Sequence, residues 1–229
     1  PNTLKVLAEE LGTSKLFTDY QKALASDVHA VIIATPNNYH AEHGFLAVRY
    51  KKHILMEKPI AGTLQEARLL RDKAIKAGLI FMMAHTYRFR TEWQHVQQWL
   101  EKFEIGKIRT AQFTGGWYLP DWHHQQDYRK EYAAKKDMGG GVVLTGLSHI
   151  LDLVGWLFGG IVRFSGLKCR VGNLEIDVED VASCTMLTDK GVLVTVHENF
   201  LERCPYRKLR ITADLGYYEF DFIKKKVKV

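Results

Sequence analysis

The pattern of hydrophobic and polar positions changes partway along the chain. Up to about residue 87, short apolar runs bounded by turn residues alternate with segments whose apolar residues recur every three or four positions. The runs predict buried strands, and the recurring segments predict helices. The expected strands are 28–34, 53–56 and 79–84, and the expected helices are 19–25, 41–48 and 64–77. Strand 28–34 is apolar almost throughout, so we expect both of its faces to be covered.

Beyond residue 87, strands dominate. Helices are expected at 92–103 and 142–158, and strands at 108–117, 161–171, 180–188, 192–199, 208–212 and 217–222. Strands that alternate with helices form parallel sheets, whereas runs of strands joined by hairpins form antiparallel ones. The predicted fold class is therefore α/β: a partial doubly wound parallel sheet in residues 1–87, followed by an α+β domain in residues 88–229 with a mainly antiparallel open sheet.

Composition narrows the functional classes. Hydrophobic residues make up 46% and charged residues 25% of the chain, which is typical of a folded globular protein. The net charge of +6 forms no basic stripe with interleaved aromatic residues, which argues against nucleic-acid binding. No apolar run reaches the roughly 18 residues that a membrane span needs. The three cysteines form no CxxC pair and fit a reducing compartment, so we expect a cytoplasmic protein.

Chemically capable residues follow two of the predicted strands. The first strand leads into the turn Thr35-Pro36-Asn37, and strand 53–56 leads into Glu57, Lys58 and a proline. Ligands of open α/β sheets bind at the carboxyl ends of parallel strands. Burial would lower the pKa of Lys58 and suit it to proton transfer. A salt bridge between Glu57 and Lys58 at an ordinary strand end explains the same spacing equally well.

A second candidate lies on the predicted helix 142–158. Thr145, His149 and Asp152 are spaced i, i+4 and i+7, which places them on one helical face. A histidine between a hydroxyl and a carboxylate can be held in one tautomer and used as an acid or a base. The residues alone favour a simpler interpretation, in which His149 is a hydrogen-bonded core histidine.

The loop 117–129 is rich in aromatic residues and ends on Arg129. Trp122 and Tyr128 offer flat faces for a sugar, and Arg129 offers a fork for an anion. An oligomer interface favours the same residue types. The adjacent histidines at 123 and 124 have no cysteine or carboxylate at metal-ligand spacing, so we expect no metal.

Four segments together carry a family resemblance. They are VIIATPNNYHAEHGFLA, HILMEKPIAGTLQEARLL, MAHTYRF and GGGVVLTGLSHILDLVGWLFG, in this order. In these segments the chain resembles the Gfo/Idh/MocA family of NAD(P)-dependent oxidoreductases. The resemblance implies a Rossmann-like domain that binds NAD or NADP, and a second domain whose sheet often forms a dimer or tetramer of identical subunits.

The resemblance also implies roles for single residues. Lys58 and His149 match the catalytic lysine and histidine, and Thr145 and His149 fall among the positions near the substrate. The positions that match cofactor-lining residues of the family are Thr35, Pro36, Asn37, His40, Glu57, Lys58 and Arg88. Thr145 stands where the family commonly has an aspartate, and a hydroxyl cannot serve as a carboxylate base. The family's opening GxGxxG turn is absent from the sequence, so we expect the dinucleotide-binding domain to be incomplete.

These observations predict an oxidoreductase acting on a CH–OH group of a sugar, sugar acid, sugar nucleotide or cyclitol. A different class remains open: a sugar-responsive binding or scaffold protein that keeps the fold without catalysis, which Thr145 favours. A hydrolase or lyase that uses the nicotinamide transiently is a third hypothesis. The sequence does not distinguish NAD from NADP.

Overall fold

Two compact units make up the chain. The computed structural model describes residues 2–102 and 105–229, and the units are Pro1–Ala84 and His85–Val229. Both predicted sheet types are present, so the predicted fold class is confirmed. The expected end of one helix at Phe103 lies outside the described residues.

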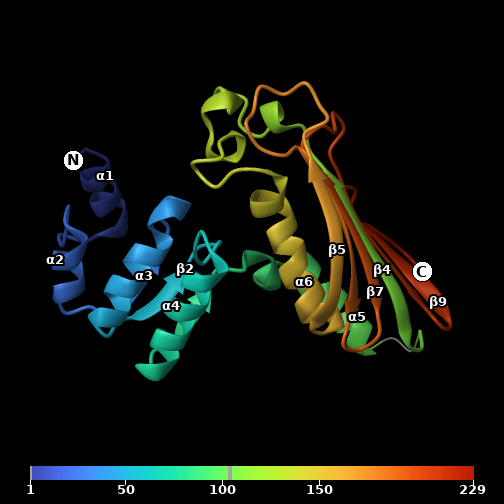
Figure 1. Ribbon diagram of the computed structural model, residues 1–229, viewed down its shortest axis with the longest axis horizontal. Coiled ribbons are helices and arrows are strands. Elements are labelled where there is room, and N and C mark those ends of the chain that lie inside the picture. The colour runs from blue at the N-terminus through green and yellow to red at the C-terminus, as the bar shows by residue number, and fades with distance from the viewer. Residues whose placement is uncertain (1, 103–104) are drawn as a thin grey trace. The chain divides into compact units, whose positions relative to one another are not determined.

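The first unit is a three-stranded parallel sheet in the order β1-β2-β3 (Figure 1). Its strands are β1 (Ala30–Ile33), β2 (His53–Met56) and β3 (Phe81–Met83), and its helices are α1 (Asn2–Leu11), α2 (Tyr20–Ala25), α3 (His40–Arg49) and α4 (Leu64–Lys76). Local signals determine where two of these helices begin. The carboxylate of Asp19 accepts hydrogen bonds from the first amides of α2, and Thr63 caps α4 in the same way.

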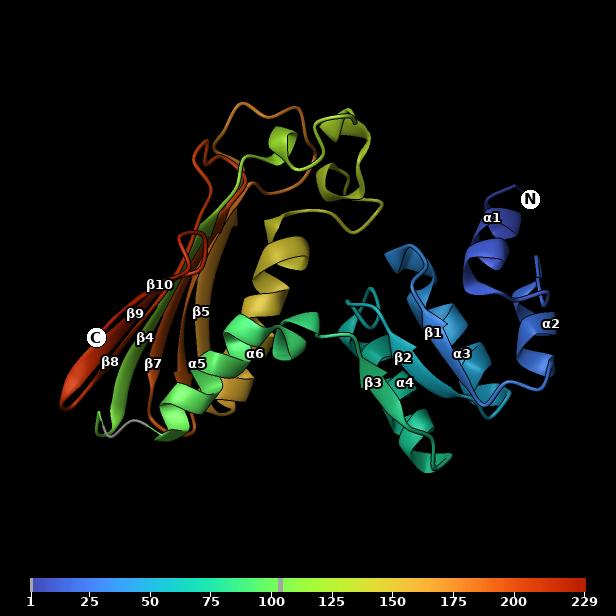
Figure 2. The same ribbon diagram turned by 180° about the vertical axis from the view of Figure 1, so that it is seen from behind.

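Helices cover only one face of this sheet among the described residues. Ile33, Ile54 and Met56 are buried on the face that packs against α3 and α4. On the other face Ile32 is 76% and Met82 44% exposed. Figure 2 shows this face, with the strands in front of the helices. The prediction that strand 28–34 is covered on both faces is therefore wrong for the described residues.

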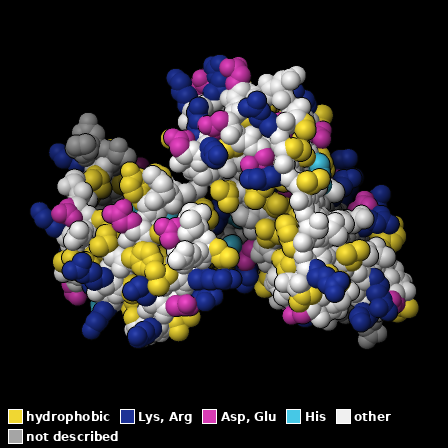
Figure 3. Space-filling model, in the orientation of Figure 1, with side chains coloured by type: hydrophobic (Ala, Val, Ile, Leu, Met, Phe, Trp, Pro, Cys, Tyr) yellow, Lys and Arg dark blue, Asp and Glu magenta, His cyan; other side chains and the backbone are white. Residues whose placement is uncertain are grey.

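The helical side of the first unit also carries exposed apolar side chains. Figure 3 shows hydrophobic side chains on this side, where Leu64, Leu69 and Ile75 of α4 are exposed. Single exposed apolar residues are normal on a protein surface and need no special explanation.

The second unit is a seven-stranded sheet in the order β10-β9-β8-β4-β7-β6-β5. The strands are β4 (Ile108–Gly116), β5 (Ile161–Cys169), β6 (Val181–Thr188), β7 (Leu193–Asn199), β8 (Tyr206–Ala213), β9 (Gly216–Asp221) and β10 (Lys226–Lys228). All neighbours are antiparallel except β4 and β7, so the sheet is mainly antiparallel, as predicted. The short strand β10 was not predicted.

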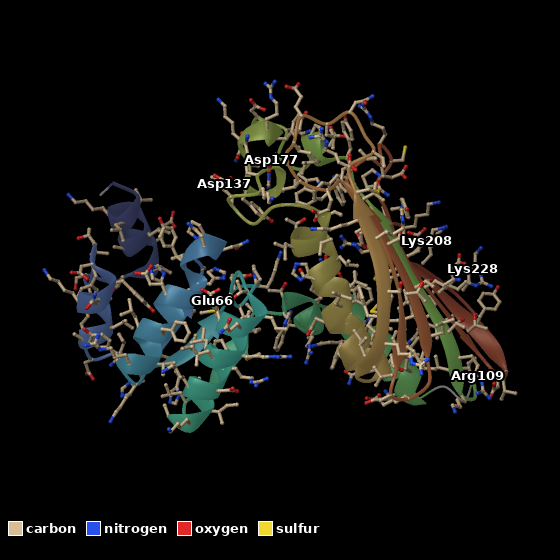
Figure 4. The ribbon with its side chains drawn as sticks, in the orientation of Figure 1. Glu66, Arg109, Asp137, Asp177, Lys208 and Lys228 are labelled. Carbon is tan, nitrogen blue, oxygen red and sulfur yellow. The ribbon has the colours of Figure 1, made fainter. Side chains whose placement is uncertain are left out.

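Two helices, α5 (Thr91–Lys102) and α6 (Ser148–Phe158), lie on the same side of this sheet (Figures 1 and 2). Alternate residues point to opposite faces of a strand. Phe113, Val196 and Leu209 therefore join one buried core beneath the helices. Lys208 lies on the side of the sheet away from α6 (Figure 4), where the sheet face is open.

The predicted helix 142–158 is not uniform. Val143–Leu147 forms a π-helical segment, and the α-helix α6 begins only at Ser148. Because a π-turn contains more residues than an α-turn, the spacing from Thr145 to His149 departs from that of a regular α-helix, whereas His149 and Asp152 both lie in α6. Within residues 2–102 and 105–229, every helix is too short or too polar to cross a bilayer.

Candidate functional site

One candidate site lies at the carboxyl ends of β1 and β2. We call it the strand-end cluster, and its members are Thr35, Pro36, Asn37, His40, Glu57 and Lys58. Ile33 pairs with Met56 in the parallel register, and the amide of Glu57 donates to the carbonyl of Ile33 at 2.9 Å. The two following loops therefore start side by side, as the sequence predicted for neighbouring strand ends.

Lys58 is half-buried at the end of β2. Burial lowers the pKa of its ammonium group, and the nearby Glu57 carboxylate opposes that shift. One Glu57 oxygen also accepts a hydrogen bond from the Lys58 amide at 3.2 Å. The Lys58-Pro59 peptide bond is cis. An amine with a lowered pKa can exchange a proton closer to neutral pH than an exposed lysine can.

His40 ties the two loops together. Its side chain is fully buried at the start of α3. The Nδ1 atom lies 2.6 Å from the carbonyl oxygen of Pro59, and Nε2 lies 2.8 Å from that of Thr35. Carbonyl oxygens only accept, so an imidazole donates to both only when both of its nitrogens carry protons. The arrangement gives His40 a positioning role between the loops.

In the second unit, the carboxylate of Asp152 on α6 is held by basic residues. Arg88 donates to it from Nε at 2.8 Å and from Nη2 at 2.6 Å, and His85 Nε2 lies 3.6 Å from one oxygen. This pairing raises the pKa of Arg88, chiefly through the hydrogen bond to Asp152. Two nitrogens of the Arg88 guanidinium are therefore occupied by Asp152, although the sequence analysis assigned Arg88 to cofactor binding.

The ring of His149 lies against another aromatic ring. Its ring stacks on Tyr87 with centroids 4.5 Å apart and planes 12° from parallel. The hydroxyl of Thr145 donates to the carbonyl of Gly141 at 2.7 Å, and Asp152 is paired with Arg88. The hydroxyl and the carboxylate of the predicted Thr145–His149–Asp152 arrangement thus each have another partner, and the arrangement itself stays a prediction.

The three loop residues predicted to contact substrate make internal contacts. Trp122 packs edge-on against Phe200, and the hydroxyl of Tyr128 accepts a hydrogen bond from a backbone amide in another loop. Arg129 pairs with the carboxylates of Asp127 and Glu175. Its guanidinium already has two acidic partners, which leaves it poorly suited to bind an anionic ligand.

One histidine of the neighbouring pair contacts a carboxylate. His123 Nδ1 lies 2.8 Å from a carboxylate oxygen of the buried Glu131. The described part of the chain contains no group of three or more potential metal ligands.

The structure adds a carboxyl group that the sequence analysis missed. Glu198 on β7 points to the buried face of the second sheet and is 8% exposed. Burial raises its pKa to about 7, against the opposing charge of Arg207. A signal was present in the sequence: Val192, Val194 and Val196 occupy the preceding inward positions, and a glutamate continues that apolar series. A polar residue in a core-facing series is a marker of function.

Comparisons with known proteins agree with this fold. Residues 1–85 match the oxidoreductase family with an NAD-binding Rossmann fold, and residues 93–222 match the GFO/IDH/MocA C-terminal domain. Among solved structures, the WlbA dehydrogenase from Bordetella pertussis, in complex with NADH and UDP-GlcNAcA, has a TM-score of 0.84 at 19% identity. That similarity covers 97% of this chain and 67% of the other, and it concerns the fold alone.

The curated relatives include two dehydrogenases with the following similarity. Levoglucosan dehydrogenase of Pseudarthrobacter phenanthrenivorans is 29% identical over 161 residues, which cover 69% of this chain and 40% of that protein. The 1-carboxy-3-chloro-3,4-dihydroxycyclohexa-1,5-diene dehydrogenase of Comamonas testosteroni is 31% identical over 74% of this chain and 42% of its own length. The chain thus spans less than half the length of these two relatives. Because its two family matches cover nearly the whole sequence in the expected order, the chain belongs to the Gfo/Idh/MocA family of oxidoreductases.

Proposed function

We propose that this protein is an NAD(P)-dependent oxidoreductase that acts on a CH–OH group of a sugar, sugar acid, sugar nucleotide or cyclitol. Family membership supports the reaction type. The names of relatives support the substrate class, since they include D-glucoside 3-dehydrogenase of Escherichia coli and scyllo-inositol 2-dehydrogenase (NADP(+)) of Bacillus subtilis. The choice among these substrates, and between NAD and NADP, needs measurement.

The observation that carries this proposal is the burial and the lowered pKa of Lys58. Oxidation of an alcohol releases a proton as the hydride leaves, and a group of suitable pKa must take that proton. Lys58 is a half-buried amine of lowered pKa at the carboxyl end of a parallel strand, where ligands of such sheets bind. We assign it the proton transfer at the reacting hydroxyl.

The strand-end cluster fits the nicotinamide half of a dinucleotide. Polar groups from two adjacent strand ends meet there, and His40 holds both loops in place through buried contacts to their carbonyls. Thr35, Asn37 and Glu57 would contact the cofactor, which supplies hydride transfer when bound. The chain's own contribution is to position these groups and to manage the proton.

His149 is the second residue to which we assign a role. Its flat stacking on Tyr87 fixes the plane of the imidazole. A ring held in this way can direct one nitrogen at a substrate hydroxyl. We assign it the binding of a hydroxyl group, whereas Trp122, Tyr128 and Arg129 support the surrounding loops.

Lysine variants of the full-length protein test the proposal. Lys58→Ala should lower kcat by at least about a hundredfold, the usual contribution of one acid–base group, with a much smaller change in KM. Lys58→Arg should fail to restore the rate, because an arginine does not release its proton. Lys73→Ala, at an exposed lysine of α4, is the matched control and should behave as the wild type. Near-normal turnover of Lys58→Ala would refute the assignment of proton transfer to Lys58.

A non-catalytic sugar-binding protein is the second candidate. Thr145 favours it, because its hydroxyl is engaged by a backbone carbonyl and cannot act as a base. This candidate predicts saturable sugar binding with no change in nicotinamide absorbance. If the protein is an oxidoreductase, the nicotinamide absorbance at 340 nm should increase when the same sugar is added.

We also propose that identical subunits associate through the sheet of the second unit. In the part of the chain that the structure describes, one face of this sheet has no helix over it, and the edge strand β5 carries exposed Phe164 and Leu167. Unpaired edge strands and apolar patches favour association. Sedimentation velocity of the wild type and of Leu167→Asp, which should shift the protein towards monomer, tests this.

A further inference from the structure

Glu198 lies in a row of paired residues that crosses four strands. Gly115 of β4 pairs with Glu198 of β7 on one side and with Arg207 of β8 on the other. On the far side of β7, Glu198 pairs with Ala182 of β6. Paired residues point to the same face of a sheet. The carboxyl group therefore has an alanine and a glycine as its lateral neighbours, which leaves room for it on the helix-covered face.

The carboxyl group lies close over Gly115. A Cβ atom built on Gly115 would fall 2.5 Å from Oε1 and 2.8 Å from Oε2 of Glu198, so a side chain at this position would force the carboxyl to move. From the helical side, the corresponding position on Gly146 is 3.6 Å from Oε2. The carboxyl therefore lies between Gly115 of β4 and Gly146 of the π-helical segment Val143–Leu147.

Among the described residues, the charge of Arg207 offsets part of the cost of burying this carboxyl. They give its oxygens no hydrogen bond and no ion pair within 4.0 Å, although Arg207 acts on it from further away. Burying a carboxylate without partners is costly. Groups kept in such surroundings are commonly found at functional sites, where a ligand provides the missing contacts.

Glu198 is linked through Arg207 and Tyr87 to His149, the residue already assigned to a substrate hydroxyl. The guanidinium carbon of Arg207 lies 5.4 Å from the ring centroid of Tyr87, and Tyr87 stacks on His149. The helix itself brings no available carboxylate to this point, since Asp152 is paired with Arg88. Glu198, Arg207, Tyr87 and His149 all belong to the second unit, and we call them the sheet–helix cluster.

We propose that Glu198 is a substrate-binding residue that accepts a hydrogen bond from a hydroxyl of a polyhydroxylated substrate, with Arg207 as the donor to a neighbouring oxygen. The proposal rests on the proposed function and names the acceptor in its substrate site. A carboxylate beside a guanidinium matches vicinal hydroxyls, each of which both donates and accepts. Loss of a hydrogen bond to a charged group weakens binding by about ten- to a hundredfold.

Binding can be measured without turnover by calorimetry in the presence of NADH, which blocks oxidation of an alcohol. The probes are myo-inositol, D-glucose and D-gluconate, added to the full-length wild type, Glu198→Gln and Glu219→Gln. Glu219 is the matched control, because its carboxylate lies on β9 and pairs with Arg210. Gly115→Ala is a second variant that displaces the Glu198 carboxyl while leaving its charge in the protein.

The proposal expects at least one probe to bind the wild type and Glu219→Gln equally, and to bind Glu198→Gln and Gly115→Ala at least about tenfold more weakly. The affinity of the wild type should rise between pH 6 and pH 8, and that of Glu198→Gln should not. Equal binding by Glu198→Gln and the wild type would overturn this inference while leaving the oxidoreductase intact. If no probe binds the wild type, the inference and the proposed substrate class fail together.

Discussion

The stability of Glu198→Gln as a function of pH is the sharpest test of the structure. Burial raises the pKa of Glu198 from 4.5 to about 7, so the folded protein holds a proton that the unfolded chain has lost between these values. Where the folded state binds more protons, stability falls as the pH rises. The buried carboxyl therefore destabilises the protein fully above about pH 7 and not at all below about pH 4.5.

The size of this effect follows from the shift. One pKa unit corresponds to 1.36 kcal/mol, so a rise from 4.5 to about 7 amounts to about 3 kcal/mol. Glutamine has nearly the same shape and never ionises. We expect Glu198→Gln to gain about 3 kcal/mol in free energy of unfolding relative to the wild type between pH 4.5 and pH 8. The two charged or titratable neighbours on β8, Arg207 and Tyr206, are unchanged in the comparison.

The assay is urea denaturation followed by tryptophan fluorescence. All five tryptophans lie in the second unit, so the signal reports the unit that contains Glu198. Trp93 is buried in the same core. Glu219→Gln should show no gain that grows with pH, because it removes only a partly exposed ion pair. A difference between wild type and Glu198→Gln that stays constant from pH 4.5 to pH 8 would refute the burial of this carboxyl.

Three further changes test other parts of the structure. Glu57→Gln removes the charge that opposes the lowered pKa of Lys58, so the rise of kcat with pH should move to lower pH; an unmoved profile would separate Lys58 from the rate. Arg88→Ala leaves the buried carboxylate of Asp152 without its forked partner and should cost about 2 kcal/mol by urea denaturation, whereas Arg88→Lys should recover only part of this; no loss would contradict the pairing. Gly155 lies within α6, and a Cβ atom built on it meets no other atom within 4 Å. Gly155→Ala should therefore raise the free energy of unfolding by about 0.5–1 kcal/mol, and a decrease would contradict the open space at this position.

Local signals in the sequence were read correctly. The apolar run before Thr35 predicted β1, and the periodic segment 64–77 predicted α4. The expected strands 180–188 and 192–199 were found as β6 and β7, which pair as neighbours in the sheet. These features depend on residues a few positions apart, whose backbone preferences and periodicity are written directly into the sequence.

Predictions of side-chain roles were less accurate where the partner of the side chain is far away in the sequence. Arg129 has the right chemistry for an anion, but two carboxylates from its own unit pair with it. Asp152 shares a helix with His149, yet Arg88 from another segment holds its carboxylate. Side-chain pairing across tens of residues depends on how elements pack, and residue type and spacing do not reveal it.

The sequence by itself determined the order of strands and helices, the two sheet types, and the position of Lys58 at a strand end. Only the tertiary structure placed Glu198 over Gly115, beside Arg207 in the next strand but one. The physical reason is that β4 and β7 pair in parallel although about 80 residues separate them, and no local pattern encodes such a pairing. The burial that raises the pKa of Glu198 arises from that pairing and from the helix packed above it.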